Sequence, residues 1–172
     1  ELRNVVVEYC TALRLANTAE FSIRTLEEAR LLSAFVAQAA AVPETASLGL
    51  AELLVNGVEH GNLGISFKEK SRLRENDCWE QEIERRLALP ENQQKRVHLV
   101  MARGEEGWIV TITDEGSGFE WQSFLEFDPE RAFAPNGRGI ALSRQLAFSS
   151  MEYLGNGNSV KVVLPYPSRE CE

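Results

Sequence analysis

The alternation of apolar and polar residues in the first third of the chain predicts a strand followed by two helices. Residues 21–24 alternate between the two kinds, as a short half-buried strand does. The segment after Thr25 carries apolar residues at helical spacing, and Thr25 itself is a suitable N-cap. Pro43 ends this helix and introduces a second one over residues 44–59, which stops near Gly61.

The next segment, residues 64–96, combines many charged residues with a sparse apolar repeat. Trp79, Ile83 and Leu87 recur every four positions, while lysine, arginine and acidic residues fill the positions between and before them. This pattern is typical of an amphipathic helix or hairpin with a heavily charged outer face.

Two pairs of strands are expected in the rest of the chain. Each pair is joined by a glycine-containing turn, which favours a hairpin. The four expected strands cover residues 96–102, 108–113, 151–154 and 159–164. Between the pairs, residues 119–136 contain two prolines and predict a mobile loop, and residues 139–147 predict a helix.

Together these elements predict an α+β fold. We expect a two-layer sandwich in which a mixed, mainly antiparallel sheet packs against helices on one side. Residues 1–16 are interpreted as an N-terminal extension or linker remnant. Residues 17–167 are then one domain, with residues 64–96 as a charged helical insert.

Composition and charge narrow the classes of partner. The 172 residues carry 18 basic and 26 acidic side chains, a formal net charge of −8. This charge repels phosphate-rich polymers, so nucleic acid is not expected as a partner. The chain also has no apolar run of membrane-spanning length. Its three widely spaced cysteines form neither a metal motif nor a disulfide framework, so we expect reduced thiols and a cytoplasmic protein.

Glu52 and Asn56 are the first candidates for chemistry. They lie four residues apart on the second predicted helix, so their side chains share one face of an otherwise apolar segment. The pair alone favours a polar seam that faces solvent. The functional alternative is that Asn56 offers its amide oxygen to Mg2+ while Glu52 accepts a proton from an attacking hydroxyl or water.

A glycine-rich run, residues 114–119, follows the predicted strand at 108–113. Asp114 starts it, and Gly116 and Gly118 follow one residue apart. Such a run is common turn chemistry, but it also suits a ligand that needs a buried acceptor and close backbone approach. A second run, Gly137-Arg138-Gly139, is either a turn before a helix or a phosphate cradle at the helix N-terminus.

The Glu52–Asn56 segment and the two glycine-rich runs follow one another in an order that resembles the Bergerat-fold (GHKL) ATPase superfamily, which includes DNA gyrase and the histidine kinases. The resemblance covers about residues 21–165. Residues 51–61, and the short interval before Gly137, are most similar to the anti-sigma-factor serine kinases. Asn158 stands where that family usually has a threonine near the adenine. The charged insert is similar to versions found as the C-terminal domain of larger bacterial regulators.

The resemblance implies a role for each run. Asn56 would hold Mg2+ that bridges the ATP phosphates, and Glu52 would be the base that deprotonates a serine hydroxyl. Asp114 would accept a hydrogen bond from the adenine amine, and Gly116 and Gly118 would let the chain pass close to the nucleotide. The remaining phosphate-binding residues would be Gly137, Arg138 and Gly139, next to a lid over residues 121–136.

The resemblance therefore predicts an ATP-dependent protein serine kinase of the anti-sigma-factor type. Its substrate would be an anti-sigma-factor antagonist of the STAS type, in a partner-switching system with a sigma or anti-sigma factor. Relatives of this kind often form homodimers. An alternative is a binding module that sequesters a sigma factor or an antagonist, with little or no kinase activity.

Overall fold

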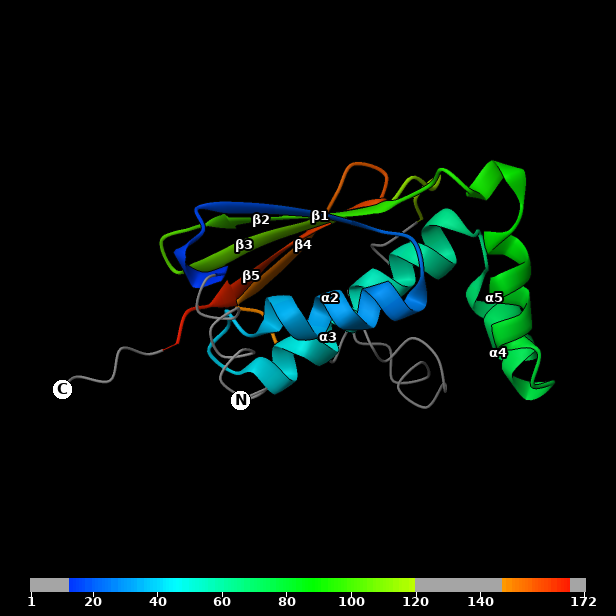
Figure 1. The fold of residues 1–172 in the computed structure, drawn as a ribbon, viewed down its shortest axis with the longest axis horizontal. Helices are drawn as coiled ribbons and strands as arrows, with labels where there is room; N and C mark the ends of the chain where they lie inside the picture. The colour runs from blue at the N-terminus through cyan, green and yellow to red at the C-terminus, as the bar shows by residue number, and fades with distance from the viewer. Residues whose placement is uncertain (1–12, 120–146, 168–172) are drawn as a thin grey trace, which may run out of the picture.

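A computed structural model of the chain describes residues 13–119 and 147–167, and the account below concerns these residues. They form one sheet with helices against it (Figure 1). The sheet has five strands in the order β1-β2-β3-β5-β4, and each neighbouring pair is antiparallel. The strands are β1 (Thr18–Ile23), β2 (Val97–Arg103), β3 (Gly107–Thr113), β4 (Ser150–Leu154) and β5 (Ser159–Pro165).

Two long helices cover one face of this sheet (Figure 1). They are α2 (Leu26–Ala37) and α3 (Pro43–Asn56), and α3 continues directly into a π-helical turn, η1 (Gly57–Asn62). Two shorter helices follow, α4 (Phe67–Glu75) and α5 (Trp79–Leu87), and then the 3-10 turn η2 (Pro90–Asn92). The α+β sandwich predicted from the sequence is confirmed, although every strand pairing among residues 13–119 and 147–167 is antiparallel rather than mixed.

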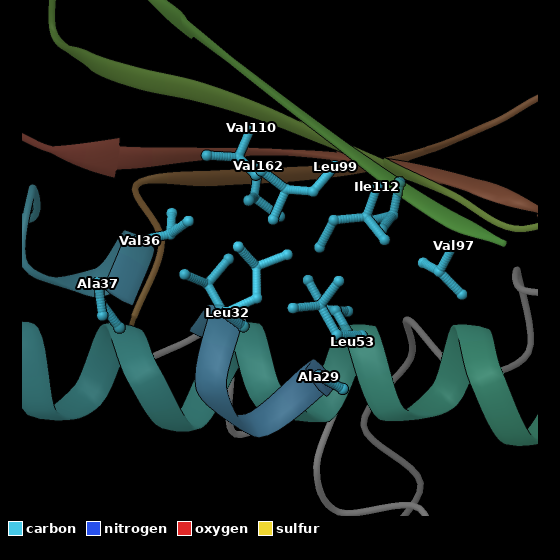
Figure 2. Packing of buried hydrophobic residues seen from close by; sticks show 14 of the residues in the cluster. Ala29, Leu32, Val36, Ala37, Leu53, Val97, Leu99, Val110, Ile112 and Val162 are labelled. Atoms are coloured by element: carbon cyan, nitrogen blue, oxygen red, sulfur yellow. The ribbon is translucent and has the colours of Figure 1, made fainter. Parts of the chain in front are cut away.

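The core lies between the sheet and the α2–α3 layer. Figure 2 shows side chains from the strands pointing toward side chains from the helices. On β2, every second residue from Val97 to Met101 is buried, which is the pattern of a strand with one covered face. On α2, Ala29, Leu32 and Val36 are buried at helical spacing. The apolar patterns read in the sequence therefore face one another.

The start of α2 is fixed by a capping box. Glu28 N–H donates to the Thr25 hydroxyl, and Thr25 N–H donates to the Glu28 carboxylate at 3.0 Å. A second N–H, that of Arg24, donates to the same carboxylate at 2.7 Å. These bonds hold the pKa of Glu28 below its usual value. The N-cap predicted at Thr25 is confirmed.

The end of α3 differs from the prediction. Instead of an α-helix up to residue 59, the chain widens at Gly57, and Leu63 N–H donates to the Val58 carbonyl five residues back at 2.9 Å. The turn packs closely against β2 at Gly57. A Cβ at this position would stand 3.1 Å from a methyl group of Val97, so a glycine allows the approach. Apolar spacing cannot distinguish the two kinds of helix over so short a stretch.

The charged segment forms a helical hairpin, which was one of the two alternatives. The α4 and α5 helices lie at one end of the molecule, beyond the end of the α2–α3 layer (Figure 1). Ile83 is the buried apolar residue of α5, and Arg86 on the same helix donates to the Leu63 carbonyl at 2.9 Å. The outer positions of both helices are largely charged and exposed, as the sequence predicts.

Strand β1 begins at Thr18, three residues earlier than expected, because Thr18, Ala19 and Glu20 pair with β2 as well. The loop predicted over residues 119–136 and the helix predicted over 139–147 fall almost entirely outside the described residues. Within the described residues, no helix is both long and apolar enough to cross a membrane.

Candidate functional site

A pocket of about 340 Å³ lies between the end of α3 and the adjoining ends of β3 and β5. Asn56 and His60 line it from the helical layer, and Asp114 lines it from the chain just after β3. Phe119 and Tyr153 contribute aromatic walls, and their rings meet edge to face at 5.2 Å between centroids. An apolar pocket with a few polar groups directed into it is the usual form of a small-molecule site.

Asp114 is the carboxylate of this pocket. Burial raises its pKa to about 6, although Gly116 N–H donates to Oδ1 at 2.8 Å and works in the opposite direction. Its backbone is held on both sides by Asn158, since Asp114 N–H donates to the Asn158 carbonyl and Asn158 Nδ2 donates to the Asp114 carbonyl, at 2.9 and 3.1 Å. A desolvated carboxylate on a fixed strand end is a strong acceptor for a ligand donor.

Gly61 explains why Asp114 can sit where it does. A Cβ at residue 61 would lie 2.3 Å from the Asp114 carboxyl carbon, so any side chain there would displace the carboxylate. Gly116 is similarly close to the η1 turn, because its Cβ would lie 2.5 Å from the Gly61 carbonyl oxygen. The η1 turn and the residues after β3 are thus in close backbone contact.

Gly118 is required by its own backbone and by the β4–β5 turn. Its φ of +79° belongs to the left-handed region, and a Cβ would lie 2.2 Å from the Asn156 carbonyl oxygen. Phe119 N–H donates to that same carbonyl at 3.0 Å. Packing within the protein therefore already accounts for both glycines of the run. Gly118 also lines the pocket, and its contact with a nucleotide remains a prediction.

Asn56 and Glu52 both lie on α3, but their positions relative to the pocket differ. Asn56 lines the pocket, and its buried Nδ2 has no hydrogen-bond partner among the described residues. A buried N–H donor of this kind is expected to meet an acceptor atom of a ligand or a water molecule. Glu52 is half-buried and does not line the pocket itself. Its charge nevertheless acts with burial and with Asp114 to raise the pKa of Tyr153.

His60 is a pocket residue to which the sequence analysis gave no role. Its Nδ1 donates to the Ile65 carbonyl, and its ring stacks on Phe67 with 4.0 Å between centroids. The bond to a carbonyl places the proton on Nδ1, so the buried Nε2 is an acceptor, and it has no partner among the described residues. Burial lowers the pKa of His60, which keeps the ring neutral. A histidine next to a glycine at the end of a helix is common, so its place in the sequence does not single it out.

The structure thus brings Asn56, Asp114 and Gly118 to one pocket, whereas Gly116 does not line it and packs against Gly61. The second glycine-rich run, Gly137-Arg138-Gly139, lies outside the described residues, and its role stays a prediction. Among the described residues, no cluster of three or more histidine, cysteine or acidic side chains could hold a metal ion alone. A cation bound at Asn56 would therefore need oxygen ligands from the substrate, as Mg2+ commonly takes from phosphates.

The comparison with known families agrees with this pocket. Residues 19–164 match the family described as histidine kinase-like ATPase domain, which is most of the chain. The chain belongs to this family. Histidine kinase-like ATPase domains bind ATP, generally with Mg2+, and membership points to ATPase-like or kinase-like chemistry. No curated protein matched the chain closely enough to refine this assignment.

The polar residues of the pocket suit the two ends of Mg-ATP, the base at one end and the metal-bound phosphates at the other. Asp114 offers an acceptor among apolar and aromatic walls, which suits a purine with an exocyclic amine. Asn56 lines the same pocket from the helix that continues into η1, and its side-chain oxygen is an atom of the kind that Mg2+ takes as a ligand. The pocket is therefore the candidate ATP site of this histidine kinase-like ATPase domain.

Proposed function

We propose that this domain is an ATP-dependent protein serine kinase of the anti-sigma-factor type. The observation that carries the proposal is the arrangement on α3, where a carboxylate, Glu52, precedes the pocket residue Asn56 by one helical turn. A domain that only binds ATP has no need of a carboxylate beside the metal ligand. Family membership supports the nucleotide part of the proposal.

At the adenine end, Asp114 would accept a hydrogen bond from the exocyclic amine. An ionised carboxylate is a stronger hydrogen-bond acceptor than its protonated form, and with a pKa of about 6 Asp114 is mostly ionised at neutral pH. Phe119 and Tyr153 would exclude water from the base, which strengthens the hydrogen bond.

At the phosphate end, the Asn56 side-chain oxygen would bind Mg2+, and the ion would neutralise charge on the phosphates. Glu52 would orient the serine hydroxyl of the substrate protein and accept its proton. The serine oxygen then forms a bond to the γ-phosphorus while the bond from that phosphorus to the β–γ bridging oxygen breaks. The products are phosphoserine and ADP, with the proton on Glu52.

The proposed protein substrate is an anti-sigma-factor antagonist of the STAS type. Its phosphorylation would release it and free a surface for a sigma or anti-sigma factor. We also propose that the domain acts as a homodimer within a larger bacterial regulator. These partners rest on the resemblance of residues 51–61, and of the short interval before Gly137, to the anti-sigma-factor kinases.

One observation favours a second candidate function. Glu52 is not among the described residues that line the pocket. This geometry favours a module that binds nucleotide and sequesters a sigma factor or an antagonist with little turnover. The two candidates differ in one product, phosphoserine.

The test is a transfer assay with Mg-ATP and an antagonist protein that binds the domain. Phosphoserine on the antagonist, detected by mass spectrometry and lost in Glu52→Gln, is the expected result. The matched control is Glu44→Gln on the first turn of the same helix, which should leave transfer intact. ATP binding without any transfer by the native domain would favour the sequestering module instead.

A further inference from the structure

Glu59 is the fully buried carboxylate among the described residues, with no exposed side-chain surface. It lies in the η1 turn, directly before the pocket residue His60. Neither the ATP site nor the proposed transfer step uses it. A buried charge is costly unless it is paired, so its partners indicate what it does.

Both oxygens of Glu59 are occupied by residues of the α4–α5 hairpin. Lys70 on α4 donates its ammonium to Oε2, and Trp79, the first residue of α5, donates its indole N–H to Oε1 at 2.6 Å. The Lys70 ammonium is itself nearly buried and lies 6.0 Å from the centre of the Trp79 ring. One carboxylate of the η1 turn thus holds both helices of the hairpin.

The opposite side of the same turn holds the adenine end of the pocket. Gly61 contacts the Asp114 carboxylate, as described above. Asn62 accepts a hydrogen bond from Glu115 N–H through its Oδ1 at 2.8 Å. Four consecutive residues, 59–62, therefore connect the hairpin on one side with Asp114 and Glu115 on the other. A shift of the turn away from the hairpin would move Gly61 and Asn62 relative to Asp114.

We propose that Glu59 is a positioning residue of the nucleotide site, through which the α4–α5 hairpin sets the affinity for the adenine end of ATP. The proposal rests on the assignment of this pocket to ATP. It gives the charged insert a defined role. Lys70 and Trp79, which are 11 and 20 residues after Glu59 in the chain, hold the η1 turn that lines the pocket.

The experiment measures the affinities of Mg-ATP and Mg-ITP by calorimetry. ITP lacks the exocyclic amine, so the ratio of the two affinities reports on the contact with Asp114. The variants are Glu59→Gln, which leaves Lys70 buried without its partner, and Glu59→Gln/Lys70→Met, which removes both charges. Glu152→Gln is the matched control, because Glu152 is paired with Lys161 on an exposed part of the sheet. Trp79→Phe removes one donor and keeps the aromatic packing, should Glu59→Gln fold poorly.

We expect Glu59→Gln to lower ATP affinity about tenfold and to reduce the preference for ATP over ITP, whereas Glu152→Gln changes neither. The double variant should recover stability, because no unpaired charge remains, but it should keep the reduced preference for ATP, because the link between the η1 turn and α4 is still missing. Trp79→Phe should show a smaller loss of the same preference. The proposal is overturned if Glu59→Gln and Trp79→Phe keep the native preference while only their melting temperatures fall. If the native domain binds neither nucleotide, the ATP site itself is wrong, and the role of Glu59 is overturned with it.

Discussion

Replacing Asp114 with asparagine should make the unliganded domain more stable and its ATP binding weaker. The pKa of Asp114 is raised from 3.8 to about 6 because burial disfavours the charged carboxylate. Its charge therefore destabilises the fold wherever the folded carboxylate is ionised. Asparagine has nearly the same shape, carries no charge and can still accept the bond from Gly116 N–H.

The size and pH range of this effect follow from the shift. One pKa unit corresponds to ~1.4 kcal/mol, so the full shift would be about 3 kcal/mol. Asp114 is partly exposed, and solvent screening reduces the expected gain to about 1–2 kcal/mol. Because the folded pKa lies above the unfolded one, the charge costs most above pH 6. The gain in Asp114→Asn should shrink as the pH falls and vanish below about pH 4, where both states are protonated.

Urea denaturation of the native and Asp114→Asn domains at pH 7.5 and at pH 4, followed by tryptophan fluorescence, measures this gain. Glu105→Gln is the matched control, because Glu105 is exposed in the turn between β2 and β3 and its exchange likewise replaces a carboxylate with an amide. We expect no change in the control. A gain of equal size at both pH values, or no gain at pH 7.5, would show that burial of the charge at Asp114 is not what the structure indicates.

Four further outcomes are expected. Glu52→Gln should abolish phosphoryl transfer and leave ATP affinity within about twofold, and a product yield near native would remove Glu52 from the chemistry. Gly61→Ala should weaken ATP binding and lower the unfolding free energy by about 1–3 kcal/mol, because its Cβ would meet the Asp114 carboxylate at 2.3 Å. In the native domain, ATP affinity should fall roughly tenfold from pH 7.5 to pH 5, because Asp114 becomes protonated. The Asp114→Asn variant should lack this loss, and its own titration over the same pH range measures the contribution of ATP protonation. Thr25→Ala should cost about 1 kcal/mol of stability through loss of the helix cap, with unchanged ATP affinity.

The main elements were predictable because their signals are local. The cap at Thr25 and the alternation along β2 and β3 specify their elements within a few residues, and the structure places them accordingly. The η1 turn was not predictable in this way. Its widening depends on the approach of Val97 and Asp114 to Gly57 and Gly61, and these contacts join residues more than 35 positions apart.

The candidate site was predictable only where residue type and ligand chemistry coincide. Asp114 and Asn56 could be proposed because they stand in motifs whose order resembles a known ATPase superfamily, whereas each residue alone also fits a turn or a polar seam. His60 and Glu59 could not, since a histidine and a glutamate at a helix end are ordinary. Their importance comes from burial and from partners on α4 and α5, which the spacing along the chain does not reveal.

The central claim is that the pocket around Asp114 binds the adenine base of ATP. Competition between Mg-ATP and Mg-ITP for the native domain tests it most directly, because the two ligands differ at the group that Asp114 is expected to contact. With ITP, a carbonyl oxygen would face the carboxylate, and two acceptors would be left without a donor. We predict that ATP binds at least about tenfold more tightly than ITP. Equal affinities for the two nucleotides would contradict the account.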